Sequence, residues 1–192
     1  MNTTRLEAFS DGVFAVIITI MVLEMKVPHG SDLHAFEPVL PVFLTYVLSF
    51  IYVGIYWNNH HHLLKAAPCV NGAIMWANLH LLFWLSLFPF VTGWMGENHF
   101  TAIPTALYGA VLVAAAIAYL ILQTRIVAVC GLNSKLASAL ARDWKGKISS
   151  LLYLLGIGLS FVHPLVAGCI YTAAALTWLI PDRRLTNVIQ ER

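Results

Sequence analysis

The stretch RLEAFSDGVFAVIITIMVLEMKVP, Arg5–Pro28, decides the fold of this protein. It is an apolar run long enough to cross a membrane, yet its first third carries Arg5, Glu7, Ser10 and Asp11. An ionised side chain in hydrocarbon costs roughly 2.5 to 3.5 kcal/mol on insertion scales. We therefore expect this charged third to be buried against other helices of the protein, where hydrogen-bond partners are present, rather than to face lipid.

The composition of the whole chain is that of an integral membrane protein. Its 192 residues are 59% hydrophobic and 10% charged, whereas an average soluble domain is about 25% charged. The net charge of +2 is small and dispersed, so nucleic acid is not expected as a partner. Cys69, Cys130 and Cys169 form no C-x-x-C pair, which argues against a disulfide framework or a zinc site. Because the H-E-x-x-H, G-x-S-x-G and Gly-rich phosphate motifs are missing, we do not expect an enzyme.

Helix-breaking stretches divide the chain into six apolar segments. A bilayer core about 30 Å thick needs about 20 helical residues. The predicted helices cover residues 4–27, 37–60, 71–95, 101–124, 142–162 and 164–181. The last two are divided at His163-Pro164, because one unbroken helix over residues 148–180 would be about 50 Å long, too long for a single crossing. The predicted fold class is all-α, a six-transmembrane-helix bundle, and residues 1–192 are predicted to form a single transmembrane domain.

The distribution of lysine and arginine predicts the orientation in the membrane. With six crossings, Lys26 falls on one side and ten basic residues fall on the other. These ten are Arg5, Lys65, Arg125, Lys135, Arg142, Lys145, Lys147, Arg183, Arg184 and Arg192. Basic residues concentrate in cytoplasmic loops. We therefore expect a multi-pass protein of the plasma membrane with both termini in the cytoplasm.

Polar side chains from the first three predicted helices lie at one depth of the bundle. At 1.5 Å per residue, this layer is near 10 Å from the cytoplasmic helix ends. Its members are Ser10, Asp11, Trp57, His60, Asn78 and His80. We expect them to form a buried network whose simplest role is adhesion between helices, worth about 0.6 kcal/mol per contact in membranes.

The histidines of this region allow two further interpretations. His60, His61 and His62 suggest a metal site, but consecutive helical residues point about 100° apart and do not converge on one ion. No metal site is therefore expected. His80 is a candidate for a pH-sensitive element, because histidine titrates near physiological pH.

The first predicted helix has two faces that differ in their neighbours. One face carries Asp11, Ala15, Ile18 and Val22, and the other, rotated by roughly 140°, carries Val16, Ile20, Leu23 and Val27. If the first face meets the polar layer, the second points out of the subunit. On periodicity alone, the second face either contacts lipid or lines the axis of an oligomer as a hydrophobic constriction. In the latter case Thr19, beside the stripe, offers a hydroxyl to a passing ion.

Three motifs resemble a known family. Arg5 through Val13 reads R-x-x-x-F-S-D-G-V, which is similar to the signature of the transmembrane protein 175 potassium channel family. The pair Trp57 and His60, and the dipeptide Asn78-Leu79 with a downstream Pro89-Phe90, resemble its second and third helices. The resemblance implies a homotetramer whose first helix lines a potassium-selective pore without a TVGYG filter, a motif that is absent here.

The resemblance also implies roles for particular positions of the first helix. The family's hydrophobic constriction falls on Val16, Ile20 and Leu23, with Val16 at the narrowest position. The residues implied to hold the helix by hydrogen bonds within and between subunits are Arg5, Phe9, Ser10 and Asp11. The implied partners are other copies of the chain, the lipid bilayer and the permeant potassium ion, and no cofactor is implied.

A second functional interpretation is a proton-coupled secondary transporter in which Asp11 and His80 relay protons. The chain shows no inverted repeat and no pair of Gly/Pro-broken helices at corresponding positions, the features that mark many such transporters. Ion flux without a co-substrate would distinguish a channel from this alternative. An intramembrane enzyme is a third interpretation, and it would require a catalytic pair that the sequence does not display.

Overall fold

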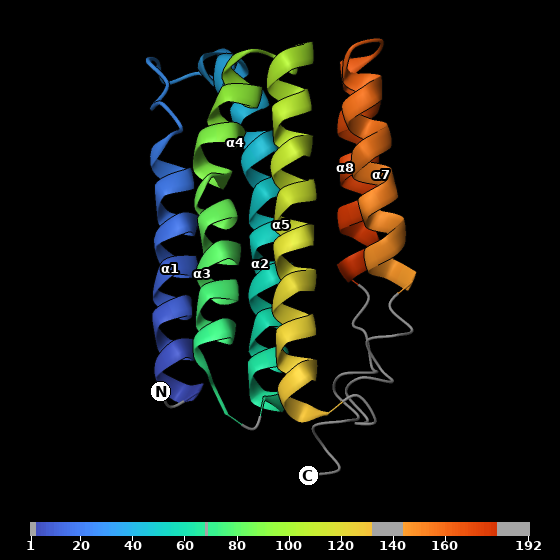
Figure 1. Cartoon of the computed structure of the whole chain (residues 1–192). Helices are drawn as coiled ribbons and strands as arrows, with labels where there is room; N and C mark the ends of the chain where they lie inside the picture. Colours follow the sequence, from blue (N-terminus) through green and yellow to red (C-terminus); the bar gives the residue numbers. More distant parts are fainter. Residues whose placement is uncertain (1–2, 68, 132–143, 180–192) are drawn as a thin grey trace.

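The computed structural model describes residues 3–67, 69–131 and 144–179. These residues form six helical rods that run alternately up and down (Figure 1). In chain order the elements are α1 (Thr3–Leu23), the 3-10 helix η1 (Leu33–Val39), α2 (Leu40–Ala66), α3 (Gly72–Ser86), α4 (Phe88–Glu97), α5 (Ala102–Cys130), α7 (Trp144–Ser160) and α8 (Pro164–Leu179). Since α3 and α4 continue one another as a single rod, the predicted all-α bundle of six helices is confirmed.

Four of the rods are long and apolar enough to cross a membrane. They are α1, η1 with α2, α3 with α4, and α5. The hairpin of α7 and α8 is shorter, with 17 and 16 described residues, and it packs beside α5 (Figure 1). With several membrane-spanning helices in one chain, the protein is a multi-pass membrane protein.

Several helix boundaries differ from the predicted ones, and the fourth predicted helix, expected over residues 101–124, continues to Cys130 as α5. The second helix continues to Ala66 instead of ending at residue 60, because nothing between residues 60 and 66 breaks a helix. The first helix ends at Leu23, four residues early. The third is interrupted at Leu87, since Pro89 has no N–H with which to bond the carbonyl four residues before it.

Tyr171 of α8 joins the α7 and α8 hairpin to the rest of the bundle. Its ring lies so close to Gly109 of α5 and Gly156 of α7 that a Cβ at either glycine would overlap it. Its hydroxyl donates to the Thr105 carbonyl at 3.3 Å, and its own carbonyl accepts a hydrogen bond from the Tyr52 hydroxyl of α2 at 2.6 Å. Through its side chain and its backbone carbonyl, this one buried residue links four helices.

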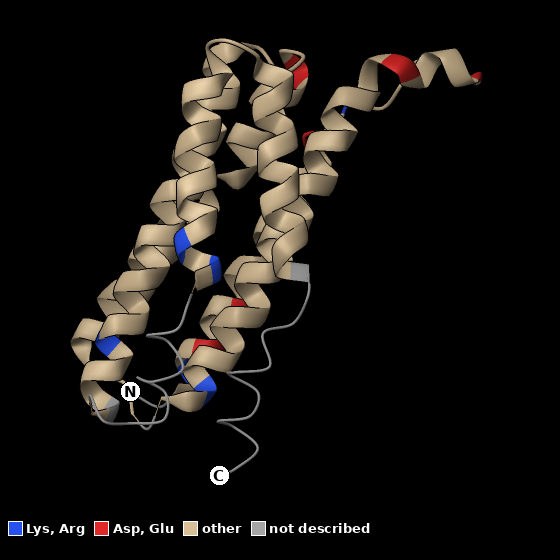
Figure 2. Ribbon diagram, turned by 90° about the vertical axis from the view of Figure 1, so that its right-hand side faces the viewer, with Lys and Arg blue, Asp and Glu red and all other residues tan. Residues whose placement is uncertain are grey.

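Most charged residues lie toward one of the two ends of the bundle (Figure 2), although Glu7 and Asp11, in the first turns of α1, are acidic residues on the side of the basic end. The basic end, where the described chain begins, carries Arg5, Lys65, Arg125, Lys145 and Lys147, and the acidic end carries Glu24, Asp32, Glu37 and Glu97. Lys26 lies at the acidic end, where its ammonium donates to Glu97 at 2.7 Å, and this hydrogen bond raises the pKa of Lys26. The predicted basic residues Lys135, Arg142, Arg183, Arg184 and Arg192 lie outside the described residues.

Candidate functional site

A chain of hydrogen bonds is buried between α1, α2 and α3 on the side of the basic end. Ser10 donates its hydroxyl to the Leu6 carbonyl at 2.8 Å, and Asn78 Nδ2 donates to Ser10 Oγ at 3.0 Å. His60 Nε2 lies 2.6 Å from Asn78 Oδ1. Ser10, His60 and Asn78 are all completely buried, so these bonds replace the water that the three side chains have lost.

The Leu6 carbonyl fixes the direction of this chain, because a carbonyl only accepts hydrogen bonds. Ser10 must then donate to Leu6 and accept from the Asn78 amide, which leaves the Asn78 oxygen to accept from His60. His60 therefore carries a proton on Nε2, and its Nδ1 is buried with no hydrogen-bond partner among the described residues. The other side of the His60 ring packs edge-on against Phe14 of α1, with 5.6 Å between the ring centroids.

A second set of contacts joins α1 to α2 nearer the protein surface. Trp57 Nε1 donates to Asp11 Oδ1 at 2.9 Å, and His61 Nδ1 lies 2.5 Å from Glu7 Oε1. The Trp57 and His61 rings are stacked on each other. Glu7 and Asp11 are four residues apart on α1, and Trp57 and His61 are four residues apart on α2. Each pair therefore lies along one side of its helix, and these two sides face each other. We call Glu7, Ser10, Asp11, Trp57, His60, His61 and Asn78 the polar cluster.

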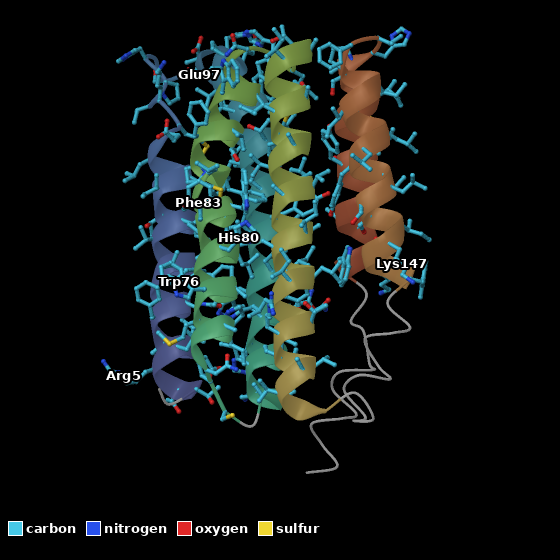
Figure 3. All side chains as sticks on the ribbon, viewed as in Figure 1. Arg5, Trp76, His80, Phe83, Glu97 and Lys147 are labelled. Atoms are coloured by element: carbon cyan, nitrogen blue, oxygen red, sulfur yellow. The ribbon has the colours of Figure 1, made fainter. Side chains whose placement is uncertain are left out.

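Three residues predicted for this network lie elsewhere. Arg5 is exposed and its side chain points away from the bundle (Figure 3), and Phe9 is 54% exposed on the same outer side of α1. His80 was placed in the network because of its depth, but it accepts a hydrogen bond from Trp84 Nε1 at 3.0 Å on an exposed face of α3. His80 follows Asn78 by two residues, which is about 200° around a helix, so the two side chains point in nearly opposite directions.

One face of α1 is covered by the bundle and the opposite face is not. Phe14, Ile17 and Met21 are buried against the neighbouring helices together with Leu6 and Ser10. This covered face is not the predicted inner face of Asp11, Ala15, Ile18 and Val22. Ala15 and Val22 are exposed, and Asp11 lies at the edge of the covered face, where Trp57 donates to it.

The uncovered face of α1 carries the residues predicted for a constriction. Val16 is 54% exposed, Ile20 41% and Leu23 79%. Exposed Thr19 lies between Val16 and Ile20 in sequence, and its hydroxyl donates to the Val16 carbonyl at 2.9 Å. The donor of Thr19 is therefore engaged by its own helix, and the lone pairs of its oxygen remain available to a cation.

Sequence reasoning did not identify Glu7 and His61 as a bonded pair of the polar cluster. The signal that could have found them is the matched spacing of Glu7 with Asp11 and of Trp57 with His61, each one helical turn apart. Within the described ranges, no group of three His, Cys, Asp or Glu side chains is arranged to hold a metal ion.

Comparison with known proteins points to one family. Residues 5–89 match the family described as "Endosomal/lysosomal potassium channel TMEM175". This matched segment contains the whole polar cluster and the uncovered face of α1.

Individual relatives agree with this match. A potassium channel of Chryseobacterium sp. (strain P1-3) is 56% identical over 191 residues, covering 100% of both chains. The human endosomal/lysosomal proton channel TMEM175 is 37% identical over 75 residues, covering 33% of this chain and 15% of the human one. A crystal structure described as a lysosomal potassium-selective channel TMEM175 homolog from Chamaesiphon minutus has a TM-score of 0.78 and 26% identity, covering 93% of this chain and 96% of that chain.

Proposed function

Because this chain belongs to the TMEM175 potassium channel family, we propose that it forms a homotetrameric, potassium-selective cation channel in which α1 of each copy lines the pore. One helix of one copy cannot enclose a path for ions, so the uncovered face of α1 needs further copies. Four is the number that the family resemblance implies. In this proposal residues 1–192 act together as a single channel domain.

The observation that carries the proposal is the asymmetry of α1. Its buried face is anchored to α2, α3 and α4, while Val16, Ile20 and Leu23 remain exposed in the described part of the chain. Around a fourfold axis these three positions form apolar rings, and a hydrophobic constriction controls hydration and ion passage. The oxygen of Thr19 faces the same path and replaces part of the hydration shell of a passing potassium ion.

The polar cluster has a positioning role in this proposal. Ser10 is bonded to Asn78 and Asp11 to Trp57, and these two bonds meet α1 from different helices. Rotation of α1 about its own axis would break both bonds. The cluster therefore holds Val16, Ile20 and Leu23 at the angle at which they face the pore, while Arg5 and Phe9, which are exposed in one copy, contact neighbouring copies.

We infer the membrane orientation from the distribution of charge. By the positive-inside rule the basic end faces the cytoplasm, and we propose that both termini lie there in a plasma membrane. The acidic end, with Glu24 and Glu97, then forms the outer mouth of the pore and attracts cations. The expectation that the chain is not an enzyme is confirmed by its family, whose description and relatives are those of ion channels.

The test is ion flux through purified protein in liposomes loaded with potassium. Potassium, sodium and proton gradients are compared without any added solute, because relatives carry the names of both potassium and proton channels. We expect flux that favours potassium. Ile20→Asn and Leu23→Asn should raise it by wetting the constriction, while Leu176→Asn, a control at an exposed apolar position of α8, should not.

Two results would contradict the proposal. If the flux through Ile20→Asn and Leu23→Asn is unchanged while assembly is intact, this face of α1 does not line the pore. Flux only with a pH gradient or an added solute would favour a proton-coupled transporter. Against that alternative, Asp11 bonds Trp57 while His80 bonds Trp84 on an exposed face of α3, so the two groups do not face each other.

A further inference from the structure

A groove separates the surfaces of α5 and α7 toward the basic end. Its volume is about 480 Å³, within the range of about 300 to 1,000 Å³ that small-molecule sites occupy. Ile117 and Leu120 of α5 form one rim, and Leu151 and Leu154 of α7 form the other. All four side chains are at least half exposed, so the groove has apolar walls and opens sideways from the bundle.

Gln123 gives this groove a polar group without a partner. The residue is only 6% exposed and lines the groove, and it makes no hydrogen bond with any described residue. The amide atoms of Gln123 are not among the fully buried side-chain atoms that lack a partner in the described residues, so they open onto the groove and are accessible to a bound molecule or to water. The Gln123 amide offers two N–H donors and one acceptor to whatever occupies the groove.

The end of the groove near Gln123 is basic and has the composition of a membrane interface. Lys147 of α7 lines it and is exposed (Figure 3). Trp178 of α8 lines it as well, and its indole N–H donates to Ser149 Oγ at 2.7 Å. Tryptophan and lysine are both typical of the level at which lipid headgroups lie. The groove therefore changes from cationic and polar at this end to apolar toward the middle of α5 and α7.

We propose that this groove binds an anionic phospholipid. The acyl chain lies between the rims formed by Ile117 and Leu120 and by Leu151 and Leu154. The phosphate lies at the basic end, where the Lys147 ammonium pairs with its charge and the Gln123 amide donates to phosphate or ester oxygens. Basic pockets between transmembrane helices are known to bind anionic headgroups.

A phospholipid explains these features better than a soluble ligand does. The opening of the groove is framed by exposed leucine and isoleucine side chains of α7 and of α5, and α5 is long and apolar enough to cross a membrane. The surrounding medium is therefore lipid, which supplies acyl chains continuously. Lys147 and the Gln123 amide lie at the end of the groove where the phosphate of such a lipid would be, and this order along the groove matches that of a phospholipid.

The test is native mass spectrometry of the purified full-length chain in detergent, titrated with phosphatidylglycerol or with phosphatidylcholine. Lys147→Gln removes the charge, Gln123→Leu removes the amide, and Leu154→Trp fills the groove. Lys65→Gln is the matched control, since Lys65 is an exposed lysine of the basic end that does not line the groove. Size-exclusion profiles establish that each variant is folded before lipid is added.

We expect retained phosphatidylglycerol and weaker retention of phosphatidylcholine. Lys147→Gln should weaken phosphatidylglycerol binding about fivefold, the contribution of one basic side chain near a lipid surface, and should reduce the preference over phosphatidylcholine. Leu154→Trp should abolish retention of both lipids, and Lys65→Gln should leave binding unchanged. Equal binding of the two lipids, equal effects of Lys147→Gln and Lys65→Gln, or no retained lipid in folded protein would overturn the proposal. None of these readouts depends on ion conduction.

Discussion

At the scale of single residues, the main feature is the one-directional hydrogen-bond chain from His60 through Asn78 and Ser10 to the Leu6 carbonyl. Ser10 and Asn78 each donate one of these hydrogen bonds and accept another, whereas His60 only donates and the Leu6 carbonyl only accepts. The loss of Ser10 or Asn78 therefore leaves two groups without their partner in this chain. Asn78 is the central member, because it alone contacts both a residue of α1 and a residue of α2 in this chain.

Asn78→Ala should destabilise the protein. Two buried hydrogen bonds are lost, and at about 0.6 kcal/mol each in a membrane the expected loss is about 1 kcal/mol. Asn98→Ala is the control, since Asn98 is exposed and bonds only the Trp94 carbonyl of its own helix. The measurement is thermal unfolding in detergent micelles, and equal stability of the two variants would contradict the importance of Asn78.

Asp11 and Trp57 should be energetically coupled. Asp11→Ala removes the acceptor and Trp57→Phe removes the donor of one 2.9 Å hydrogen bond, so the double variant should be more stable than the sum of the two single effects predicts. The expected coupling is about 0.6 kcal/mol and at most about 1.7 kcal/mol. The double-mutant cycle is measured by unfolding, together with assembly state and ion preference.

We expect Asp11→Ala to weaken the assembled protein more than it alters ion preference. Intact assemblies with reversed preference would show that Asp11 acts on the ion directly.

Sequence reasoning predicted how far along their helices the polar side chains lie, but it did not predict in which direction around the helix axis His80 points. The common level of Ser10, His60 and Asn78 follows from counting residues at a fixed helical rise. His80 has nearly the depth of Asn78 but lies on another face of α3, and its direction depends on which face of α3 meets α1 and α2. Packing between the helices decides which face of α3 meets α1 and α2, and a single sequence does not show that packing.

At the scale of the elements, α1 illustrates the same limit. Periodicity predicted two faces of α1, and Val16, Ile20 and Leu23 are indeed exposed. The covered face was predicted around Asp11, because Asp11 was expected to find hydrogen-bond partners in a buried polar layer rather than to face lipid. In the structure uncharged Ser10 lies deepest, and Asp11 stays at the edge where the Trp57 indole reaches it. This arrangement satisfies the carboxylate without complete desolvation.

The glycine contact between α7 and α8 gives a prediction at this scale. Gly156→Ala should destabilise the hairpin by about 1 to 3 kcal/mol, the usual cost of overpacking, because the new methyl group overlaps the Tyr171 ring. Gly158→Ala is a matched control two residues away, with no atom within 4 Å of the added Cβ. Thermal unfolding in detergent compares the two, and a stable Gly156→Ala protein would show that Tyr171 moves freely.

At the scale of the whole molecule, the position of α1 at one side of the bundle (Figure 1) makes assembly testable. In a cysteine-free background, Leu23→Cys should form disulfides between copies under mild oxidation, since four copies of α1 surround the proposed axis. Leu176→Cys on α8 should not, although Leu176 is also exposed. Denaturing electrophoresis without reductant reports the linked species. The opposite pattern, with links only through Leu176→Cys, would place α8 rather than α1 at the contact between copies.

The long sequence separation between the partners of the polar cluster has a consequence for biosynthesis. Trp57 follows Asp11 by 46 residues and Asn78 follows Ser10 by 68. At about 5 to 20 residues per second on the ribosome, the codon for Trp57 is translated about 2 to 9 s after that for Asp11. The nascent α1 therefore reaches the translocon while its carboxylates have no partner, and it docks only after α2 and α3 emerge. Membrane insertion of α1 and its final rotation are thus two events separated by seconds.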